Sequence, residues 1–388
     1  MELTTLKQVI VGLVDGRREQ LAGVAEQLFR FSETGLEEYR SSALLADILE
    51  QEGFRLERRV AGLDTAFRAV FGSGGPTIAI LAEMDALPVL GHACGHNVIA
   101  AAAIGAAIAL RHAVPDDEAR IVVLGTPAEE LGIGKVELVK AGIFQGVDAA
   151  IMVHPSSRRL VIKHYLGLAR VRFTFFGRPA HAAAYPEEGV NALDGVIQTF
   201  NGINALRQQL RQDVRVHGII TDGGVAPNII PATAACHFYV RATDLDEVGR
   251  VRERVIACAE GAARATGCRL EVFADERVLA PLKINHTLSG LYSEQLAYLG
   301  LPEATAPPDK NLGSSDIGNV SQVVPTIHPH VPIGAGLHIH TEDFARATVS
   351  EQGRQAVVEG ATAMALTAAE LIVRPELRKK MWDEFGSS

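Results

Sequence analysis

The sequence has little of what marks several common protein classes. Only four of its 388 residues are cysteine (Cys94, Cys236, Cys258 and Cys268), too few for a disulfide framework, so a special cysteine is expected to be a ligand or a nucleophile. Basic residues are in the minority, with 37 Lys and Arg against 46 Asp and Glu, and the formal net charge is −9. No run of Lys and Arg forms a basic stripe, so we expect no nucleic-acid partner.

Long apolar runs are also missing. The longest, residues 98–110, is mostly alanine and has 13 residues, whereas a membrane span needs about 20. The apolar run at residues 9–14 is followed by Asp15 and Arg17 rather than by a small-residue cleavage site, unlike a signal peptide. We therefore expect no membrane association and a cytoplasmic location. The 47% of hydrophobic residues is typical of a globular chain, and the length suggests about two domains.

The first part of the chain alternates between helical and strand-like patterns. Residues 5–53 contain two helical patterns with apolar residues every three or four positions. They are followed by strands at 65–71 and 77–82, helix 98–112, strand 119–124, helix 135–141 and strand 149–153. This alternation predicts an α/β domain with a largely parallel mixed sheet.

A different order of elements follows. Strand, helix, two strands, helix and strand are predicted at 169–176, 189–210, 214–221, 232–242, 245–266 and 269–274. This is the order of the split ferredoxin-like α+β unit. Because α/β patterning resumes near residue 288, we place this second domain at 168–279 as an insertion that divides the first domain into 1–167 and 280–388.

Side chains that commonly bind metals follow three successive strands. Cys94 and His96 lie where a strand ends and a helix begins, Glu129 and Glu130 follow strand 119–124, and His154 ends strand 149–153. Each has an ordinary structural explanation when taken alone: a buried thiol, a carboxylate in a first helical turn or a strand terminator. Together they favour a metal site, because open α/β sheets bind ligands at the carboxyl ends of their parallel strands.

Several segments together resemble the aminoacylase and carboxypeptidase superfamily of two-metal amidohydrolases, the peptidase family M20 type. The resemblance is strongest to the branch with p-aminobenzoyl-glutamate, indoleacetyl-amino-acid and hippurate hydrolases and β-alanyl dipeptidases. It covers nearly the whole chain, in residues 32–38, 83–88, 92–97, 126–130, 177–182, 226–231, 313–316 and 340–342. It implies a zinc-peptidase-like catalytic domain interrupted by a dimerisation, or lid, domain.

The resemblance also implies a set of metal ligands. Cys94 bridges two metal ions, Glu130 and His340 complete one site, and His96 and His154 complete the other. His338 competes with His340 for its place, and Thr341 offers the alternative interpretation of this loop as a helix N-cap. Thiolate, imidazole and carboxylate ligands suit two divalent transition metals, Zn or Mn foremost and Co or Ni as alternatives, rather than Ca or Mg.

Roles for other residues are carried over in the same way. Glu129 becomes the general base, and Asp85 supports a ligand rather than binding metal. In the inserted domain, His181 reaches the partner's active site in a homodimer to stabilise the oxyanion, although a surface histidine is an equal alternative. Substrate is bound by a last set of residues: Asn228, Arg241, Gly313 and Ser314. Arg241 is expected to hold a substrate carboxylate.

The sequence therefore predicts a metal-dependent amidohydrolase that acts on N-acyl amino acids or short dipeptide-like substrates. One alternative is a thiol amidase with Cys94 as nucleophile and His96 as base, which leaves the Glu129–Glu130 pair and the distant histidines without a role. Another is a non-catalytic relative that binds a small molecule or scaffolds a partner. Chelator-sensitive amide hydrolysis separates the three.

Overall fold

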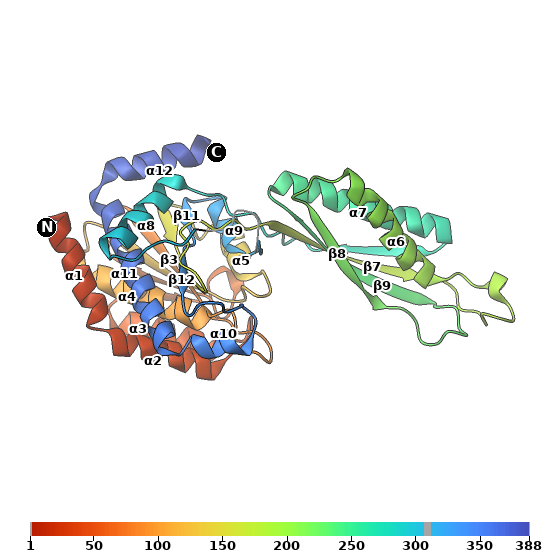
Figure 1. Ribbon diagram of the computed structural model, residues 1–388, viewed down its shortest axis with the longest axis horizontal. Helices are drawn as coiled ribbons and strands as arrows, with labels where there is room; N and C mark the ends of the chain where they lie inside the picture. Colours follow the sequence, from red (N-terminus) through yellow and green to blue (C-terminus); the bar gives the residue numbers. More distant parts are fainter. Residues whose placement is uncertain (1, 306–311, 388) are drawn as a thin grey trace. The chain divides into compact units, whose positions relative to one another are not determined.

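The computed structural model describes residues 2–305 and 312–387, and they fall into two compact units (Figure 1). Unit 1 contains Met1–His164 and the chain from Leu282 onward, except for Leu312–Ser314. Those three residues join Tyr165–Pro281 in unit 2.

Unit 1 is built on a six-stranded mixed sheet with the order β1-β2-β4-β3-β5-β11. The central pairs β3–β4 and β3–β5 and the edge pair β5–β11 are parallel, whereas β1–β2 and β2–β4 are antiparallel. The strands are β1 (Arg55–Arg58), β2 (Phe67–Phe71), β3 (Thr77–Glu83), β4 (Arg120–Thr126), β5 (Ala149–Ile151) and β11 (Thr326–Ile327). Every residue of β3 is buried, and Glu83 at its end pairs with Thr126 of β4. The predicted α/β fold with a largely parallel mixed sheet is confirmed.

Two long helices form the centre of the unit 1 core. The helix α4 (His96–Ala113) packs against α11 (Glu351–Val373), and its residues 96–110 are all buried. Small side chains allow this close packing: a Cβ on Gly105 would lie 2.7 Å from Leu21 Cδ1 and 3.0 Å from Ala361 Cβ. Among the described residues, α11 is the one helix long and apolar enough to cross a membrane, and 89% of its apolar window is buried inside the protein.

The remaining helices of unit 1 cover this core. They are α1 (Leu3–Asp15), α2 (Arg18–Phe31), α3 (Tyr39–Gln51), α5 (Gly134–Lys140), α8 (His286–Tyr298), α9 (Ile317–Ser321), α10 (Glu342–Ala347) and α12 (Pro375–Ser387). The two helical patterns expected in residues 5–53 are α2 and α3. A third helix, α1, precedes them and buries Leu6, Ile10 and Val14, which are spaced four residues apart.

One predicted strand divides into two. The strand expected at 149–153 ends at Ile151, and His154 begins a separate short strand, β6 (His154–Ser156). This strand pairs in parallel with β12 (His330–Pro332), with His154 opposite His330. The chain therefore leaves the main sheet just before His154.

Unit 2 is an antiparallel sheet with the strand order β10-β7-β9-β8 and two helices. Its elements are β7 (Gly167–Phe176), α6 (Ala192–Leu206), β8 (Arg215–Asp222), β9 (Thr233–Ala242), α7 (Leu245–Thr266) and β10 (Arg269–Ala274). Alternate residues of β7, including Val171, Phe173 and Phe175, are buried in the unit 2 core. The side chains of Asn191 and Asp244 cap the first turns of α6 and α7. The predicted β-α-β-β-α-β order is observed.

Candidate active site

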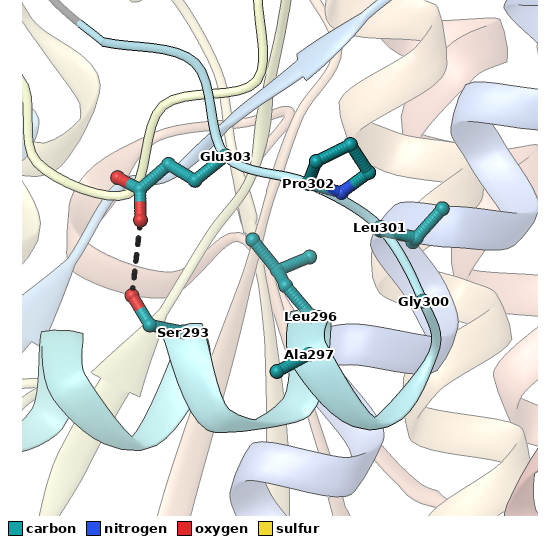
Figure 2. Close-up of a pocket in the computed structure, with 7 residues that line it drawn as sticks. All are labelled: Ser293, Leu296, Ala297, Gly300, Leu301, Pro302 and Glu303. Carbon is teal, nitrogen blue, oxygen red and sulfur yellow. Dashed lines mark hydrogen bonds between the residues drawn. The ribbon is translucent and has the colours of Figure 1, made fainter.

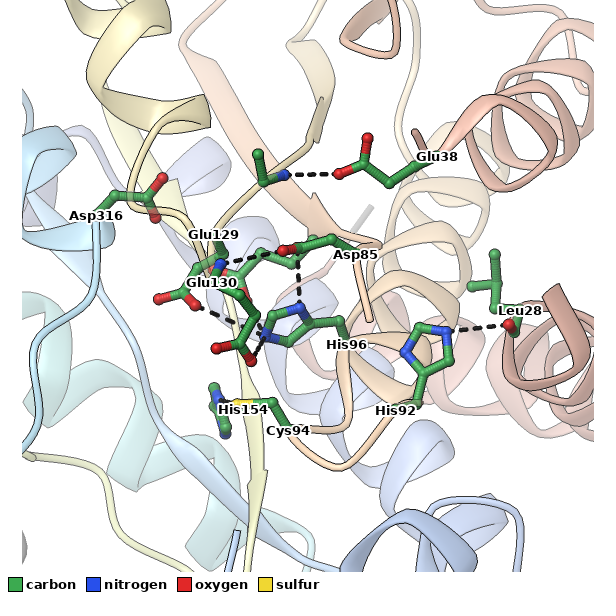
Figure 3. A network of polar contacts seen from close by, with 12 residues as sticks. Leu28, Glu38, Asp85, His92, Cys94, His96, Glu129, Glu130, His154 and Asp316 are labelled. Carbon is green, nitrogen blue, oxygen red and sulfur yellow. Dashed lines mark hydrogen bonds and ion pairs between the residues drawn. The ribbon is translucent and has the colours of Figure 1, made fainter. Parts of the chain in front are cut away.

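Four segments of unit 1 bring thiol, imidazole and carboxylate groups together (Figure 3). One group consists of Cys94, His96 and His154, and the other of Cys94, Glu130 and His340. Within each group the ligand atoms lie within 4.8 Å of one another. The two groups share Cys94, which is the geometry that a bridging ligand requires.

Unusual backbone geometry accompanies three of these segments. Gly95, between Cys94 and His96, has φ +85°, and a Cβ there would lie 2.3 Å from Pro155 Cγ, so only glycine allows this close approach. Ala128, directly before Glu129, has φ +56°, and His340 has φ +64°. The backbone N–H of His340 donates to the carbonyl of Ala93 at 2.8 Å. Strained positions of this kind persist where the surrounding structure holds them, commonly at functional sites.

Hydrogen bonds orient two of the histidines. Nδ1 of His154 lies 2.7 Å from the carbonyl of Pro155, and because that oxygen can only accept, Nδ1 carries the proton. Nε2 of His154 therefore directs its lone pair towards Cys94 Sγ, 3.5 Å away. Nδ1 of His96 donates to Asp85 Oδ1 at 3.0 Å, which leaves Nε2 to face the carboxylates.

Asp85 links the two ligand groups. Besides holding His96 through Oδ1, it accepts the backbone N–H of Glu130 on Oδ2 at 3.0 Å. Its side chain is buried. Asp85 therefore contacts one residue from each group, which is the supporting position expected from the sequence.

The arrangement fits two divalent metal ions. Among the described residues, His96 Nε2 and Glu130 Oε1 are buried atoms without a hydrogen-bond partner, a costly condition unless another group binds there. Glu130 Oε1 lies 3.8 Å from His96 Nε2 and 3.8 Å from His340 Nε2. Burial raises the pKa of the Cys94 thiol, so the thiolate that ligation requires forms together with metal binding.

The same raised pKa argues against Cys94 as a nucleophile. A reactive cysteine needs an environment that stabilises its thiolate, whereas burial opposes ionisation here. His96, the base in that alternative, is held by Asp85.

Glu129 lies beside the ligands. Its Oε2 is 4.0 Å from His96 Nε2, and it forms a further group with His96 and Glu130. Burial, Glu83 and Asp316 raise the pKa of Glu129 well above its ordinary value. A carboxylate in this setting can take up a proton and hold it.

Sequence reasoning missed a buried ion-pair network beside Glu129. Lys135 Nζ lies 2.7 Å from Glu83 Oε1 and 2.6 Å from Asp316 Oδ1. The only sequence signal was that Lys135 falls among the apolar residues of α5, where Val136 and Leu138 are also buried.

Glu38 was missed as well. It is buried, accepts the backbone N–H of Ala128 on Oε1 and accepts Thr65 Oγ1 on Oε2, each at 2.8 Å. It thereby supports the strained residue in front of Glu129. Its place in the segment 32–38 was the available signal.

The C-terminal histidine loop combines both of its expected roles. His340 joins the ligand group, whereas His338 belongs to neither group among the described residues. The Thr341 hydroxyl accepts the backbone N–H of Phe344 at 3.3 Å and caps α10.

The other predicted residues lie in unit 2. The backbone N–H groups of Ala183 and Ala184 donate to His181 Nδ1 at 3.3 and 3.1 Å, so the ring proton of a neutral His181 is on Nε2. Ala182 N–H donates to the carbonyl of Asn228. Arg241 donates to Ser314 Oγ at 2.8 Å, and the Gly313 carbonyl accepts the N–H of Leu166 at 2.8 Å.

A pocket elsewhere in unit 1 contains none of these residues. It has a volume of about 460 Å³ and is lined by residues of α8 and the following loop, with Ser293 donating to Glu303 as its one labelled polar contact (Figure 2). A single carboxylate does not make a metal centre, so this pocket is separate from the ligand groups.

Comparisons with known proteins agree with this geometry. A family model described as the peptidase dimerisation domain matches residues 166–266. Xaa-Arg dipeptidase of Mus musculus is 37% identical over 400 residues, which cover 99% of this chain and 93% of the relative. A p-aminobenzoyl-glutamate hydrolase of Escherichia coli is 34% identical in one of its polypeptides, over 75% of this chain and 64% of that polypeptide. A dinuclear metal-binding peptidase of the M20 family from Bacillus subtilis superposes with a TM-score of 0.70 at 21% identity, covering 92% of this chain and 99% of that one.

Proposed function

The chain belongs to the M20 family of peptidases and amidohydrolases, which hydrolyse C–N amide bonds, and we propose that its two ligand groups and Glu129 form the hydrolytic centre. The observation that carries the proposal is that both groups share Cys94, with Glu129 beside them. A non-catalytic relative would have no reason to retain both the ligands and the carboxylate.

The protein's own groups would divide the reaction between them. Divalent ions held by Cys94, His96, Glu130, His154 and His340 acidify a water molecule and polarise the scissile carbonyl when bound. Glu129 takes the proton from that water and delivers it to the leaving amine. Asp85 keeps His96 and Glu130 in place for both ions. The mixed thiolate, imidazole and carboxylate set favours Zn or Mn.

The substrate we favour is a dipeptide with a basic C-terminal residue. The support is the similarity to Xaa-Arg dipeptidases of mouse and human, 37% and 35% identical over 99% of this chain. An N-acyl glutamate is the second candidate, because of the similarity to the p-aminobenzoyl-glutamate hydrolase. In either case Arg241, with Ser314, Gly313 and Asn228, would bind the free carboxylate of the substrate.

The functional unit we propose is a cytoplasmic homodimer formed through unit 2. The matched dimerisation domain supports the dimer, and the edge strand β8 exposes the apolar side chains of Ile219 and Ile220. His181 Nε2–H would donate to the oxyanion in the partner's active site. The four cysteines are all free, which suits a reducing compartment.

Substrate profiling of the metal-reconstituted enzyme tests the proposal. We expect kcat/KM to be higher for Xaa-Arg and Xaa-Lys dipeptides than for p-aminobenzoyl-glutamate and N-acetyl amino acids. A Glu129→Gln control should retain both metals and lose about 100- to 10,000-fold in kcat. Unchanged turnover in Glu129→Gln, or no hydrolysis across the panel by a fully metallated wild type, would contradict the proposal.

A further inference from the structure

Lys135 is a fully buried cation in contact with the carboxylates around the proposed base. Its Nζ lies 2.7 Å from Glu83 Oε1 and 2.6 Å from Asp316 Oδ1. Its backbone N–H also donates to Asp316 Oδ2 at 2.9 Å, so both oxygens of Asp316 are bound to this one residue. The ammonium is therefore held in a fixed position.

The carboxylates around Lys135 have the spacing of a metal site. Oxygens of Glu83, Glu129 and Asp316 lie within 4.8 Å of one another, and Glu83 and Asp316 are fully buried. Three oxygen donors at this distance resemble the ligand sets of Ca²⁺, Mg²⁺ and Mn²⁺. The ammonium contacts two of the three, as a metal ion bound there would.

Glu129 is the member of this cluster that remains available. Within the part of the chain that the structure describes, no ion pair joins Lys135 to Glu129, whereas Glu83 and Asp316 both pair with it. Glu129 thus belongs at once to the carboxylate cluster and to the group with His96 and Glu130. A third metal ion in the cluster would make Glu129 a ligand and remove it from proton transfer.

We propose that Lys135 is a positioning residue that serves as the built-in cation of the Glu83–Glu129–Asp316 cluster, keeping a third divalent ion out and leaving Glu129 free to act as the base. The inference rests on the proposed hydrolytic function. Its physical basis is that buried carboxylates require a compensating charge. A tethered ammonium supplies that charge without occupying the lone pairs of Glu129.

The test compares Lys135→Met with the wild type and with Lys140→Met. Lys140 is the matched control, because it is on the same helix and its side chain is 50% exposed. The probe is Mn²⁺, counted per chain by elemental analysis after saturation and desalting. We expect Lys135→Met to bind one more Mn²⁺ than the wild type and to lose about 100-fold or more in kcat, the contribution of a general base. Lys140→Met should match the wild type in both measurements.

A charge-balanced variant, Lys135→Met/Asp316→Asn, separates metal exclusion from simple charge neutralisation. It should bind the same number of Mn²⁺ ions as the wild type, because it lacks one carboxylate of the cluster. If Lys135→Met folds poorly alone, added Mn²⁺ should restore its cooperative thermal unfolding.

Two results would overturn the proposal. One is a folded Lys135→Met that binds no more Mn²⁺ than the wild type. The other is a Lys135→Met that Mn²⁺ cannot restore while the double variant folds. The proposed function fails by a different result, a wild type that binds no metal or hydrolyses nothing, because the inference depends only on the difference between variant and wild type.

Discussion

Asp85 offers a direct test of how the metal centre is held together. Its two oxygens accept from His96 Nδ1 and from the backbone N–H of Glu130, each at 3.0 Å. In Asp85→Asn the side chain keeps its shape, but one oxygen becomes an NH₂ group that faces a donor. One of the two contacts is therefore lost, whereas Asp85→Ala loses both.

The size of the effect follows from the burial of Asp85. A hydrogen bond to a charged group contributes about 1.5–3 kcal/mol, or about 10- to 150-fold in a dissociation constant. Loss of a partner that orients a ligand typically costs about 10- to 100-fold in metal affinity. We expect Asp85→Asn to weaken one metal site by this factor and Asp85→Ala to weaken both.

Competition against a chelator of known affinity measures the two dissociation constants. Glu370→Gln is the control, because Glu370 is also a buried carboxylate of unit 1, paired with Lys7 and Arg374, and belongs to no ligand group. Metal affinities for Asp85→Ala within twofold of the wild type would refute the reasoning, as would equal losses in Glu370→Gln.

Three further predictions concern other residues. Burial and Asp85 raise the pKa of Glu38 to about 7 from an ordinary value of 4.5, so the folded state binds an extra proton between these pH values. Relative to Glu38→Gln, the free energy of unfolding of the metal-free wild type should fall by about 3 kcal/mol as pH rises from 4.5 to above 7, and a constant difference in urea denaturation would contradict this. Mixing inactive His181→Ala chains with Glu129→Gln chains should restore part of the activity, and no recovery after verified subunit exchange would place His181 outside the partner's site. Arg241→Ala should lower kcat/KM for a substrate with a free carboxylate about 10- to 150-fold but not for its carboxamide analogue, and equal losses on both would move carboxylate binding to another residue.

Much of the fold was predictable because its signals are local. The helix at 245–266 and the strand at 269–274 were predicted with the bounds that the structure shows, since apolar periodicity and capping residues lie within each element. The place where the chain leaves β5 before His154 was not, because it depends on pairing with β12, more than 170 residues further along the chain.

The sequence by itself determined which chemical groups this protein contains and which of them are neighbours: Cys94 with His96, and Glu129 with Glu130. Only the tertiary structure decided how distant groups combine. His340 rather than His338 joins Cys94 and Glu130 because its left-handed backbone and its hydrogen bond to Ala93 hold it there. Lys135 could not be recognised from its neighbours in the chain, because a lysine is buried only where distant carboxylates compensate its charge, and Glu83 and Asp316 lie 52 residues before it and 181 residues after it.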